Sequence, residues 1–578
     1  MHRISYLIGV VVLILINPSA LPSQKDSILI DTNEVNSKLD SFINYAPDLT
    51  AVITANSTVL FDHGPLNQLS SETLELNFHR PYDAILNKIP GVIMQSGAIN
   101  TNRISIRGIG NRSSFSTTKL KAYLDDIPLT TGIGETTIED IDISLLESIT
   151  VSKGPTEVEY GSNLGGMVHL NTASHATKNS WTLRSHLGSF GTYQLANTLE
   201  LKLKASSLWL GQQYLHSDGF RDNNEYDRWH FFALYKKKQQ KSEFSIFANH
   251  IDLAAEIPSA LNINDFISDP RKAADNWNAV NGRENYSRSR LAINHRLNLK
   301  DSTRLSTTIS GQLYDSYEVR PFNILDDALV NLDTRISLDG IHLGNSGLKL
   351  KTGFELFYEE YNFTIFESLA GEQGLQEDEK KDQRSALNLF FQAHKSMPNW
   401  SWTLGASAQW YRFNRTELGV LDESILNFDL DLYPQFTLSY LGLKNKKLQF
   451  ILSRGISIPN FEESLLPDGQ LNPDIAVESG WNSELVFQYN GPLYNSQFTA
   501  QGYAMYITDM LVARRTAQDA FFSINAGSAW MRGAELSYRQ ILKITPKTDI
   551  EMQLDYCFTW HRFGNFIDDQ MDFSGNAI

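Results

Sequence analysis

From about residue 181 onward, apolar and polar residues alternate along the chain in a long series of segments. A two-residue period places polar side chains on one face of a β-strand and aromatic or aliphatic side chains on the other. Many of the segments are about ten residues long, which is the length that a tilted strand needs to cross a bilayer. The clearest segments are 181–190, 196–205, 206–216, 228–238, 242–251, 288–299, 302–317, 400–414 and 448–458.

The connections between these segments alternate between short polar turns, such as 236–242, and long irregular loops, such as 252–287 and 319–334. This alternation is typical of bacterial outer-membrane barrels. A periplasmic propeller or sandwich is the alternative. A propeller would show a blade repeat of about 40–50 residues, which the chain lacks, and such long loops are uncommon in compact soluble domains. The pattern therefore favours a membrane β-barrel.

Residues 1–23 predict a secretory signal peptide. His2 and Arg3 precede a thirteen-residue apolar run that ends at Ile16, and small and polar residues follow it. A spanning helix needs about 20 apolar residues, so an N-terminal anchor helix is the weaker alternative. The signal predicts export across the inner membrane.

Composition excludes several classes of function. The net charge of −16 argues against a nucleic-acid-binding protein, because neutralising phosphates needs a surplus of Lys and Arg. Cys557 is the only cysteine, so the chain forms no intramolecular disulfide, cysteine-rich zinc site or iron–sulfur cluster. The 31 Phe, 23 Tyr and 10 Trp suit a barrel with aromatic residues at its membrane interfaces.

Residues 71–175 have a different character, because a helical pattern is mixed there with strands and glycines. Ile85, Leu86 and Ile89 share one helical face, and a Pro-Gly pair ends that helix before a strand. The segment DDIPL reads as a turn between strands. These rules predict a small α+β domain.

Four motifs in this region occur in a specific order. They are RPYDAILNKIPGVIMQSG (80–97), RISIRGIGNRSS (103–114), AYLDDIPL (122–129) and IEDIDISLLESITVSKGPTEVEYGSNLGGMVHLNT (138–172). Their order and spacing closely resemble the plug domain of TonB-dependent outer-membrane receptors. Three later segments also resemble this family: 217–232, 453–488 and 524–538.

The resemblance implies a mainly β protein, in which a transmembrane antiparallel β-barrel holds a small α+β plug domain in its lumen. A barrel of this family has 22 strands. The expected organisation is a signal peptide (1–23), a periplasmic segment (24–70), the plug (71–175) and the barrel (176–578). The last residues, DFSGNAI, lack the terminal aromatic strand that is usual in the family. We therefore expect an incomplete barrel that lacks about four C-terminal strands.

The resemblance also implies a lock between plug and barrel. In the family, two basic plug residues pair with two barrel glutamates. Here the motifs place them at Arg107 and Lys153, and at Glu484 and Glu535. Arginine is usual at the position of Lys153, and lysine keeps the charge but lacks the bidentate fork. The alternative is that these residues are ordinary solvated charges of the lumen.

Plug loops are the expected ligand contacts. The candidate residues are Arg112, Phe115, Lys119, Thr130, Thr131 and Glu135. Basic and aromatic side chains together suit an anionic, partly aromatic chelate. The alternative is that these loops are merely solvated.

An extended segment near the N-terminus is the candidate TonB box. It comprises Asp26, Ser27, Ile28, Leu29, Ile30, Asp31 and Thr32. The energy-transducing partner TonB, with its inner-membrane motor proteins, would capture such a segment by strand addition. A disordered tail with a chance β-branched run is the alternative.

The function implied is TonB-dependent uptake of a scarce nutrient across the outer membrane of a Gram-negative cell, with a ferric siderophore or ferric citrate-like chelate as the expected substrate. Alternatives are a cobalamin or small-oligosaccharide importer, and a non-transporting surface receptor or adhesin. The stretches 455–459 and 472–475 do not match the haem-receptor motifs. No enzymatic constellation, cofactor site, metal-ligand cluster or nucleic-acid partner is expected, and outer-membrane lipid is the expected surrounding.

Overall fold

The computed structural model describes residues 66–578 apart from short gaps. The gaps are 77–80, 97–101, 112–116, 133, 300–302, 345, 420–421, 461, 467–469, 492–495, 516–520, 526, 546–547 and 569–570. The predicted signal peptide and TonB box, and the candidate ligand residues Arg112 and Phe115, lie outside the described residues. No helix among the described residues is long and apolar enough to cross a membrane.

The first folded part is a small α+β plug built on a mixed sheet. Its strands have the order β1-β6-β7-β4-β5, and only the pairing of β4 with β7 is parallel. The strands are β1 (Leu66–Ser70), β4 (Lys121–Leu124), β5 (Ile127–Pro128), β6 (Leu146–Lys153) and β7 (Gly166–Thr172), and a separate hairpin joins β2 (Val92–Ser96) to β3 (Asn102–Ile106). Two short helices and two 3₁₀ turns complete the plug: α4 (Ser71–Leu76), α5 (Tyr82–Leu86), η2 (Ile143–Leu145) and η3 (Val158–Tyr160).

The predicted helical face forms part of the plug core. Ile85, Leu86 and Ile89 are buried, and they belong to one hydrophobic cluster with the strands of the mixed sheet. The side chain of Asn87 at the end of α5 fixes the next strand, since its amide donates to the Met94 carbonyl at 3.0 Å and its oxygen accepts from the Met94 N–H at 2.7 Å. The prediction of a small α+β domain is confirmed.

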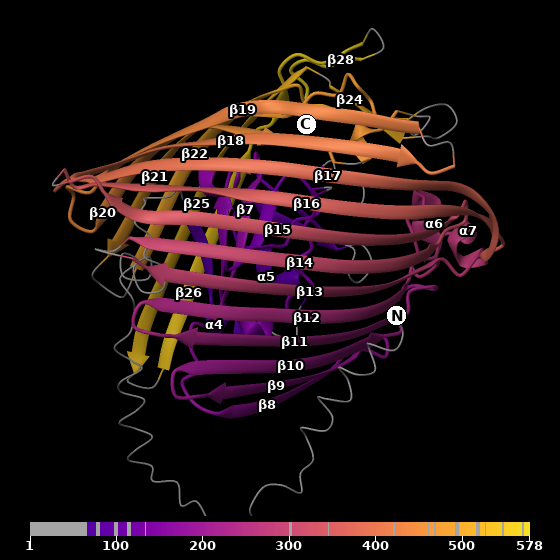
Figure 1. Ribbon diagram of the computed structural model, residues 1–578, viewed down its shortest axis with the longest axis horizontal. Helices are drawn as coiled ribbons and strands as arrows, with labels where there is room; N and C mark the ends of the chain where they lie inside the picture. The colour runs from indigo at the N-terminus through magenta and orange to yellow at the C-terminus, as the bar shows by residue number, and fades with distance from the viewer. Residues whose placement is uncertain are drawn as a thin grey trace, which may run out of the picture. The chain divides into compact units, whose positions relative to one another are not determined.

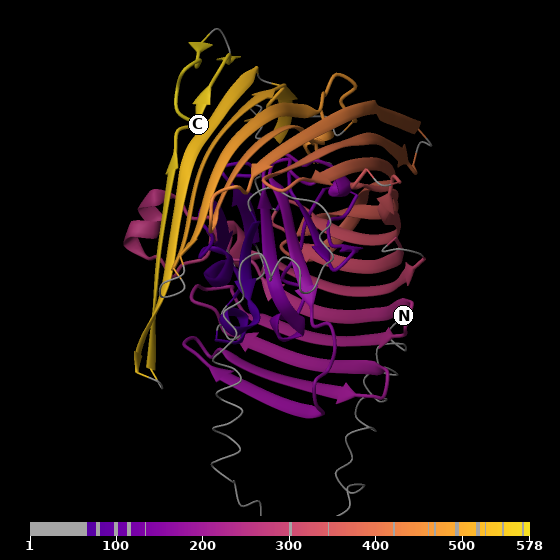
Figure 2. The ribbon, with the colours of Figure 1, turned by 90° about the vertical axis from the view of Figure 1, so that its left-hand side faces the viewer.

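A large antiparallel sheet curves around the plug (Figures 1 and 2). Each long strand pairs with its neighbour in the chain, and the barrel order places the short β27 between β26 and β8. The strands are β8 (Ser180–Leu187), β9 (Tyr193–Lys202), β10 (Ser206–Ser217), β11 (Tyr226–Lys238), β12 (Ser242–Glu256), β13 (Arg283–Asn298), β14 (Arg304–Val319), β15 (Ile324–His342), β16 (Leu348–Leu369), β17 (Glu372–Ser396), β18 (Trp400–Glu417), β19 (Asp422–Tyr440), β20 (Lys446–Ser457), β21 (Glu478–Gly491), β22 (Ser496–Thr508), β25 (Ser528–Thr545), β26 (Thr548–Thr559) and β27 (Arg562–Phe563).

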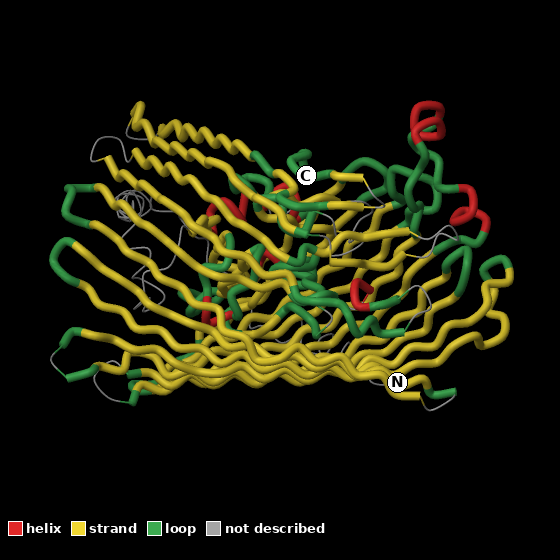
Figure 3. Tube along the Cα trace, turned by 90° about the horizontal axis from the view of Figure 1, so that it is seen from above, coloured by secondary structure: helices red, strands yellow, loops and turns green. Residues whose placement is uncertain are grey.

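The two faces of this sheet differ in polarity. Buried polar side chains, such as Gln392, Thr437 and Asn482, lie on the face toward the plug, whereas Leu291 and Leu485 are exposed on the other face. This is the reverse of a soluble protein and is what a membrane barrel requires, because lipid covers the outer face. Figure 3 shows the plug elements enclosed by the strands.

The two ends of the barrel also differ. Short turns lie at one end, and the long connections at the other end include α6 (Ile263–Ser268) and α7 (Asp275–Ala279) between β12 and β13 (Figure 1). The connection between β22 and β25 contains a hairpin of β23 (Leu511–Arg515) and β24 (Phe521–Asn525). A second hairpin, β28 (Ile567–Asp568) with β29 (Met571–Asp572), follows β27.

The predicted loop at 319–334 is wrong. The connection between β14 and β15 covers only residues 320–323, because β15 begins at Ile324. Inward-facing Asp327, Asn331 and Asp333 are buried against a polar lumen. Their polarity hides the two-residue apolar period that the prediction relied on.

Gly166 gives a test of the plug fold. Its φ of +102° lies in the left-handed region, and an added Cβ would meet the backbone oxygen of Ser152. We expect Gly166→Ala to destabilise the plug by about 1–3 kcal/mol, because both the backbone and the contact become strained. Urea-dependent protease cleavage of the plug in the refolded protein measures this loss. Gly419→Ala is the control, since no atom lies within 4 Å of its added Cβ, and equal losses in both variants would contradict the expectation.

Candidate functional site

Four charged side chains meet where the plug faces β21 and β25. Arg107 directly follows β3 and Lys153 ends β6, while Glu484 and Glu535 point inward from β21 and β25. All four residues are buried. The structure therefore brings together the four residues that the motifs select, on strands that are more than 300 positions away in the chain from the plug residues.

Arg107 is the centre of this cluster. Its Nη1 and Nη2 donate to the two carboxylate oxygens of Glu484 at 2.8 and 3.2 Å, and its Nε donates to Glu535 Oε1 at 3.0 Å. Lys153 Nζ donates to the other oxygen of Glu535 at 2.6 Å. The arginine thus joins both barrel strands, whereas the lysine contacts only one carboxylate.

Neighbouring polar groups complete the cluster. The amide of Asn482 donates to Glu484 Oε1 at 2.8 Å, and the amide of Gln501 donates to Glu535. The guanidinium of Arg107 lies 4.1 Å from the ring centre of Tyr503. Buried charges are tolerated only when their remaining hydrogen-bonding capacity is satisfied, and these contacts meet that condition.

The local backbone explains how Arg107 reaches the barrel. Its φ is +52°, a left-handed value, and its N–H donates to the carbonyl of Gly91 at 2.7 Å. A Cβ at Gly91 would collide with the carboxylate of Glu535. Glycine at position 91 therefore lets the barrel glutamate approach the end of the β2–β3 hairpin.

Burial affects the two cations differently. Burial alone would lower the pKa of Arg107, but Glu484 and Glu535 outweigh it, so its pKa lies above the ordinary value and the side chain stays charged. The pKa of Lys153 is lowered, because burial and the nearby Arg107 outweigh the attraction of Glu535. Of the two cations in the cluster, Lys153 therefore loses its proton more easily than Arg107.

A second contact region joins the plug to β15 and β16. Arg335 Nη2 donates to Glu159 Oε2 of η3 at 3.0 Å, and its Nη1 donates to Glu355 Oε2 at 3.1 Å. Lys351 Nζ lies 2.5 Å from the same oxygen of Glu159. The guanidinium of Arg335 also lies 4.3 Å from the ring centre of Tyr160. The sequence offers no signal for this region, because Arg335 follows the segment that was predicted to be a loop.

A third contact region joins the plug to β11 and β13. Arg288 pairs with Asp140, and Arg228 Nη2 donates to the backbone oxygen of Glu139 at 2.8 Å. Burial, with a contribution from Asp140, raises the pKa of the Glu139 carboxyl to about 7. The plug is thus tied to the wall of the barrel on several sides.

A cleft lies between the plug and the wall formed by β16–β18 and the β20–β21 connection. Three of the candidate ligand residues line it, namely Lys119, Thr130 and Thr131. The enclosed part of the cleft has a volume of about 90 Å³. Small-molecule sites usually have about 300–1,000 Å³, so the cleft can hold only one group of a larger ligand. Glu135 lies on the same plug loop as the threonines but is not part of the cleft wall. Residues that the sequence did not indicate also line the cleft, among them Lys121, Tyr123, Phe357, Asn388, Tyr411 and Pro459.

The two lysines that line the cleft differ in how closely they are paired with carboxylates. Lys119 Nζ pairs with Glu478 at 2.6 Å and with Glu463 at 3.2 Å, and these glutamates outweigh burial and raise its pKa. Lys121 Nζ is only loosely paired, 3.7 Å from Glu355 Oε1. The ammonium of Lys121, aromatic rings and hydroxyl groups can together recognise a small polar ligand. The resemblance of segment 453–488 to the family could have pointed to this wall, because Ser457, Ile458 and Pro459 lie in that segment and line the cleft.

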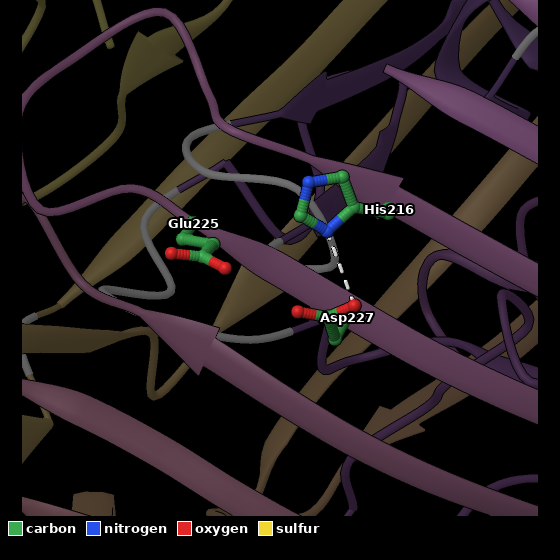
Figure 4. Close-up of side chains that lie close together, drawn as sticks. All are labelled: His216, Glu225 and Asp227. Atoms are coloured by element: carbon green, nitrogen blue, oxygen red, sulfur yellow. Dashed lines mark hydrogen bonds and ion pairs between the residues drawn. The ribbon is translucent and has the colours of Figure 1, made fainter. Parts of the chain in front are cut away.

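One group of possible metal ligands lies on the outer face of the barrel, among the described residues. His216, Glu225 and Asp227 have their ligand atoms within 4.8 Å of one another (Figure 4). His216 Nδ1 is 3.1 Å from Asp227, and its Nε2 is 3.2 Å from Asp218. Both ring nitrogens are thus hydrogen-bonded to carboxylates, so a metal ion could bind only in place of one of these bonds.

The geometry defines a β-barrel whose lumen holds a plug through buried ion pairs. The family model for the TonB-dependent receptor-like β-barrel matches residues 241–578, and that for the TonB-dependent receptor plug domain matches residues 63–168. The chain belongs to the TonB-dependent receptor family, whose members are outer-membrane receptors and transporters rather than enzymes. The predicted family and fold class are confirmed.

Solved structures with the same fold include transporters of different substrates. The unliganded ferric citrate transporter FecA is 14% identical with a TM-score of 0.70, and the match covers 87% of this chain and 79% of that one. The ferric yersiniabactin uptake receptor FyuA from Yersinia pestis is 14% identical with a TM-score of 0.68, covering 89% and 80%. The copper transporter OprC is 13% identical with a TM-score of 0.68, covering 87% and 80%.

The buried cluster predicts unequal effects of its two cations. We expect Arg107→Met to destabilise the seated plug by about 3–5 kcal/mol, because it leaves Glu484 as an unpaired buried charge. Lys153→Met should have a smaller effect, since Arg107 still pairs with Glu535. Urea-dependent protease cleavage of the plug measures both losses. Arg184→Met is the control, because its 3.8 Å contact with the exposed Glu75 contributes at most about 1 kcal/mol. A larger effect of Lys153→Met would contradict this order.

Glu139 predicts a dependence of plug stability on pH. Its pKa is raised from 4.5 to about 7 in the folded protein, so its contribution to stability is fully present below pH 4.5 and is lost as the pH rises through about 7. We expect Glu139→Gln to weaken this fall in plug stability between these pH values. The midpoint of urea-induced plug release, measured across this pH range in the variant and the parent, tests it. Identical pH profiles would refute this role of Glu139.

Proposed function

We propose that this chain is an outer-membrane transporter that binds a ferric chelate in the cleft between plug and barrel and imports it with energy from TonB. The observation that carries the proposal is the placement of the cleft. It is lined by residues of both the plug and the barrel, so a ligand bound there touches the part that has to move. The family membership and the fold shared with transporters of iron chelates and copper support the same function.

The chemistry of the cleft supports an anionic chelate. Lys121 is the cation that is least neutralised there, and Tyr123, Phe357 and Tyr411 supply aromatic surface. An ammonium group attracts carboxylate or phenolate oxygens, and aromatic rings pack against flat chelating groups. Siderophores and citrate-like chelators bound to iron present both kinds of group.

The buried cluster of charges supports a mechanism in which the plug is held in place at rest and is displaced during transport. Arg107, Lys153, Glu484 and Glu535 act in this proposal as the lock between plug and barrel. The proposed TonB box at residues 26–32 would transmit the pull of TonB to the plug. The signal peptide at 1–23 would deliver the chain to the outer membrane.

Ligand binding to the refolded full-length chain tests the substrate class. Quenching of tryptophan fluorescence is measured with ferric citrate, ferric hydroxamate and catecholate siderophores, haem, cobalamin, copper and small oligosaccharides. We expect one ferric chelate to bind, and Lys121→Gln to weaken it about tenfold or more, because a hydrogen bond to a charged group contributes about 1.5–3 kcal/mol. Lys447→Gln, at the opposite end of the barrel from the long loops, is the control.

The same panel contains the outcomes that would contradict the proposal. Binding of cobalamin or an oligosaccharide alone would keep transport but replace the substrate. Binding without uptake of radiolabelled iron in cells that contain TonB would indicate a non-transporting surface receptor. Deleting residues 26–32 should abolish uptake and leave binding intact.

A further inference from the structure

The short-turn end of the barrel carries exposed lysines beside exposed apolar side chains. In the turn between β9 and β10, Leu203 is 46% exposed and lies between the exposed Lys202 and Lys204. In the turn between β19 and β20, Leu443 is 49% exposed and precedes the exposed Lys444. Both turns thus place an apolar side chain directly beside a lysine.

Three further lysines lie near the ends of strands on the outer face. Lys237 lies on the same outward face of β11 as Tyr235, and Lys395 lies on the same outward face of β17 as the exposed Phe391. On β20, Lys446 Nζ lies 5.9 Å from the ring centre of Tyr489 on the neighbouring strand. These three lysines therefore lie at separate positions around the barrel, on β11, β17 and β20.

Aromatic side chains mark the membrane interface at the same end. Trp400 begins β18 and Tyr440 ends β19, and their ring centres are 4.6 Å apart on the outer face. Trp and Tyr at this position in a barrel lie at the level of lipid headgroups. The lysines on the strand ends and in the turns are thus at, or just beyond, the headgroup level.

The opposite end of the outer face has different charges. His216 pairs there with Asp227, and His250 Nε2 lies 3.0 Å from Asp252. Lys272 and Lys381 at that end are also paired with carboxylates, whereas Lys237, Lys395 and Lys446 of the short-turn end lie beside apolar and aromatic side chains. In barrels of this kind the short turns face the periplasm, so the lysines face the inner leaflet of the outer membrane.

We propose that the lysines of the short-turn end bind the anionic headgroups of phospholipids in the periplasmic leaflet. The methylene groups of each lysine would lie along the apolar wall and its ammonium would reach the phosphate layer. Each lysine near a membrane surface attracts anionic lipids by this combination of charge and depth. The inference rests on the proposed function only in that it places the barrel in the outer membrane.

Lipid selectivity of the reconstituted full-length protein tests the inference. Vesicles of phosphatidylcholine with a minor fraction of phosphatidylglycerol receive spin-labelled forms of each lipid, and the motionally restricted fraction of each is measured. We expect the parent to prefer phosphatidylglycerol. The triple variant Lys237→Gln, Lys395→Gln and Lys446→Gln should lose about fivefold in relative association at each site, because one lysine near an anionic surface contributes about that factor. High salt should reduce the preference of the parent.

Two matched variants separate charge from position. Replacing the same three lysines with arginine keeps the charge and should keep the preference. Lys272→Gln with Lys381→Gln, at the end with long loops, should leave it unchanged. A barrel that inserts but shows no preference, or a glutamine variant that retains it, overturns the inference and leaves the proposed function intact. A barrel that does not insert into vesicles overturns both.

Discussion

A polar barrel lumen in a membrane has to be filled, and the charges buried in it have to be paired. The outer face of this sheet is apolar because lipid covers it, so by strand alternation the inner face carries the polar residues. Arg335, Arg384 and Glu484 lie on that inner face and are almost completely buried. Without the plug, Glu484 would lose Arg107 and Arg335 would lose Glu159, whereas Arg384 pairs with Glu359 within the barrel. The plug is therefore a structural requirement of the barrel as well as a barrier in it.

The way in which the plug is held allows it to be moved. Its three polar contact regions consist of ion pairs and hydrogen bonds. Apolar contacts also join plug and barrel, because the plug core around Ile85 and Val168 continues into Trp209, Phe232, Leu234 and Phe247, and Ile109 and Leu164 pack against Met505, Ile507 and Met531. When such a domain shifts, water can replace the broken polar contacts on both surfaces, whereas an apolar interface would expose its surface to water. Polar atoms without a protein partner already lie along the described part of the lumen, for example on His230 and Gln392. Water can thus take over the polar contacts when the plug is displaced, whereas the apolar contacts with the barrel oppose the displacement.

The parts of the fold that follow local rules could be predicted from the sequence. The α5 face, the DDIPL turn and most strands of β8–β14 depend on periodicity and turn residues, which are local properties. Arg107, Lys153, Glu484 and Glu535 could be selected because each lies in a recognisable motif. The contact of Glu159 with Arg335 could not. Glu159 lies in the motif at 138–172, but Arg335 belongs to no such motif, and their pairing depends on where η3 meets β15. Strand β15 itself was hidden by its buried aspartates.

The cleft and the second contact region share one residue. Glu355 lines the cleft, accepts hydrogen bonds from Tyr123 of the plug at 3.0 and 3.2 Å, and accepts another from Arg335 at 3.1 Å. Arg335 in turn holds Glu159 of η3. A charged ligand beside Lys121 acts on the same carboxylate that this chain of contacts depends on, since charges a few ångströms apart interact strongly away from bulk water. The side chains of the proposed ligand site and those that hold the plug on this side are therefore one connected network. Glu355 is linked to Glu159 of η3 through a single intermediate residue, Arg335.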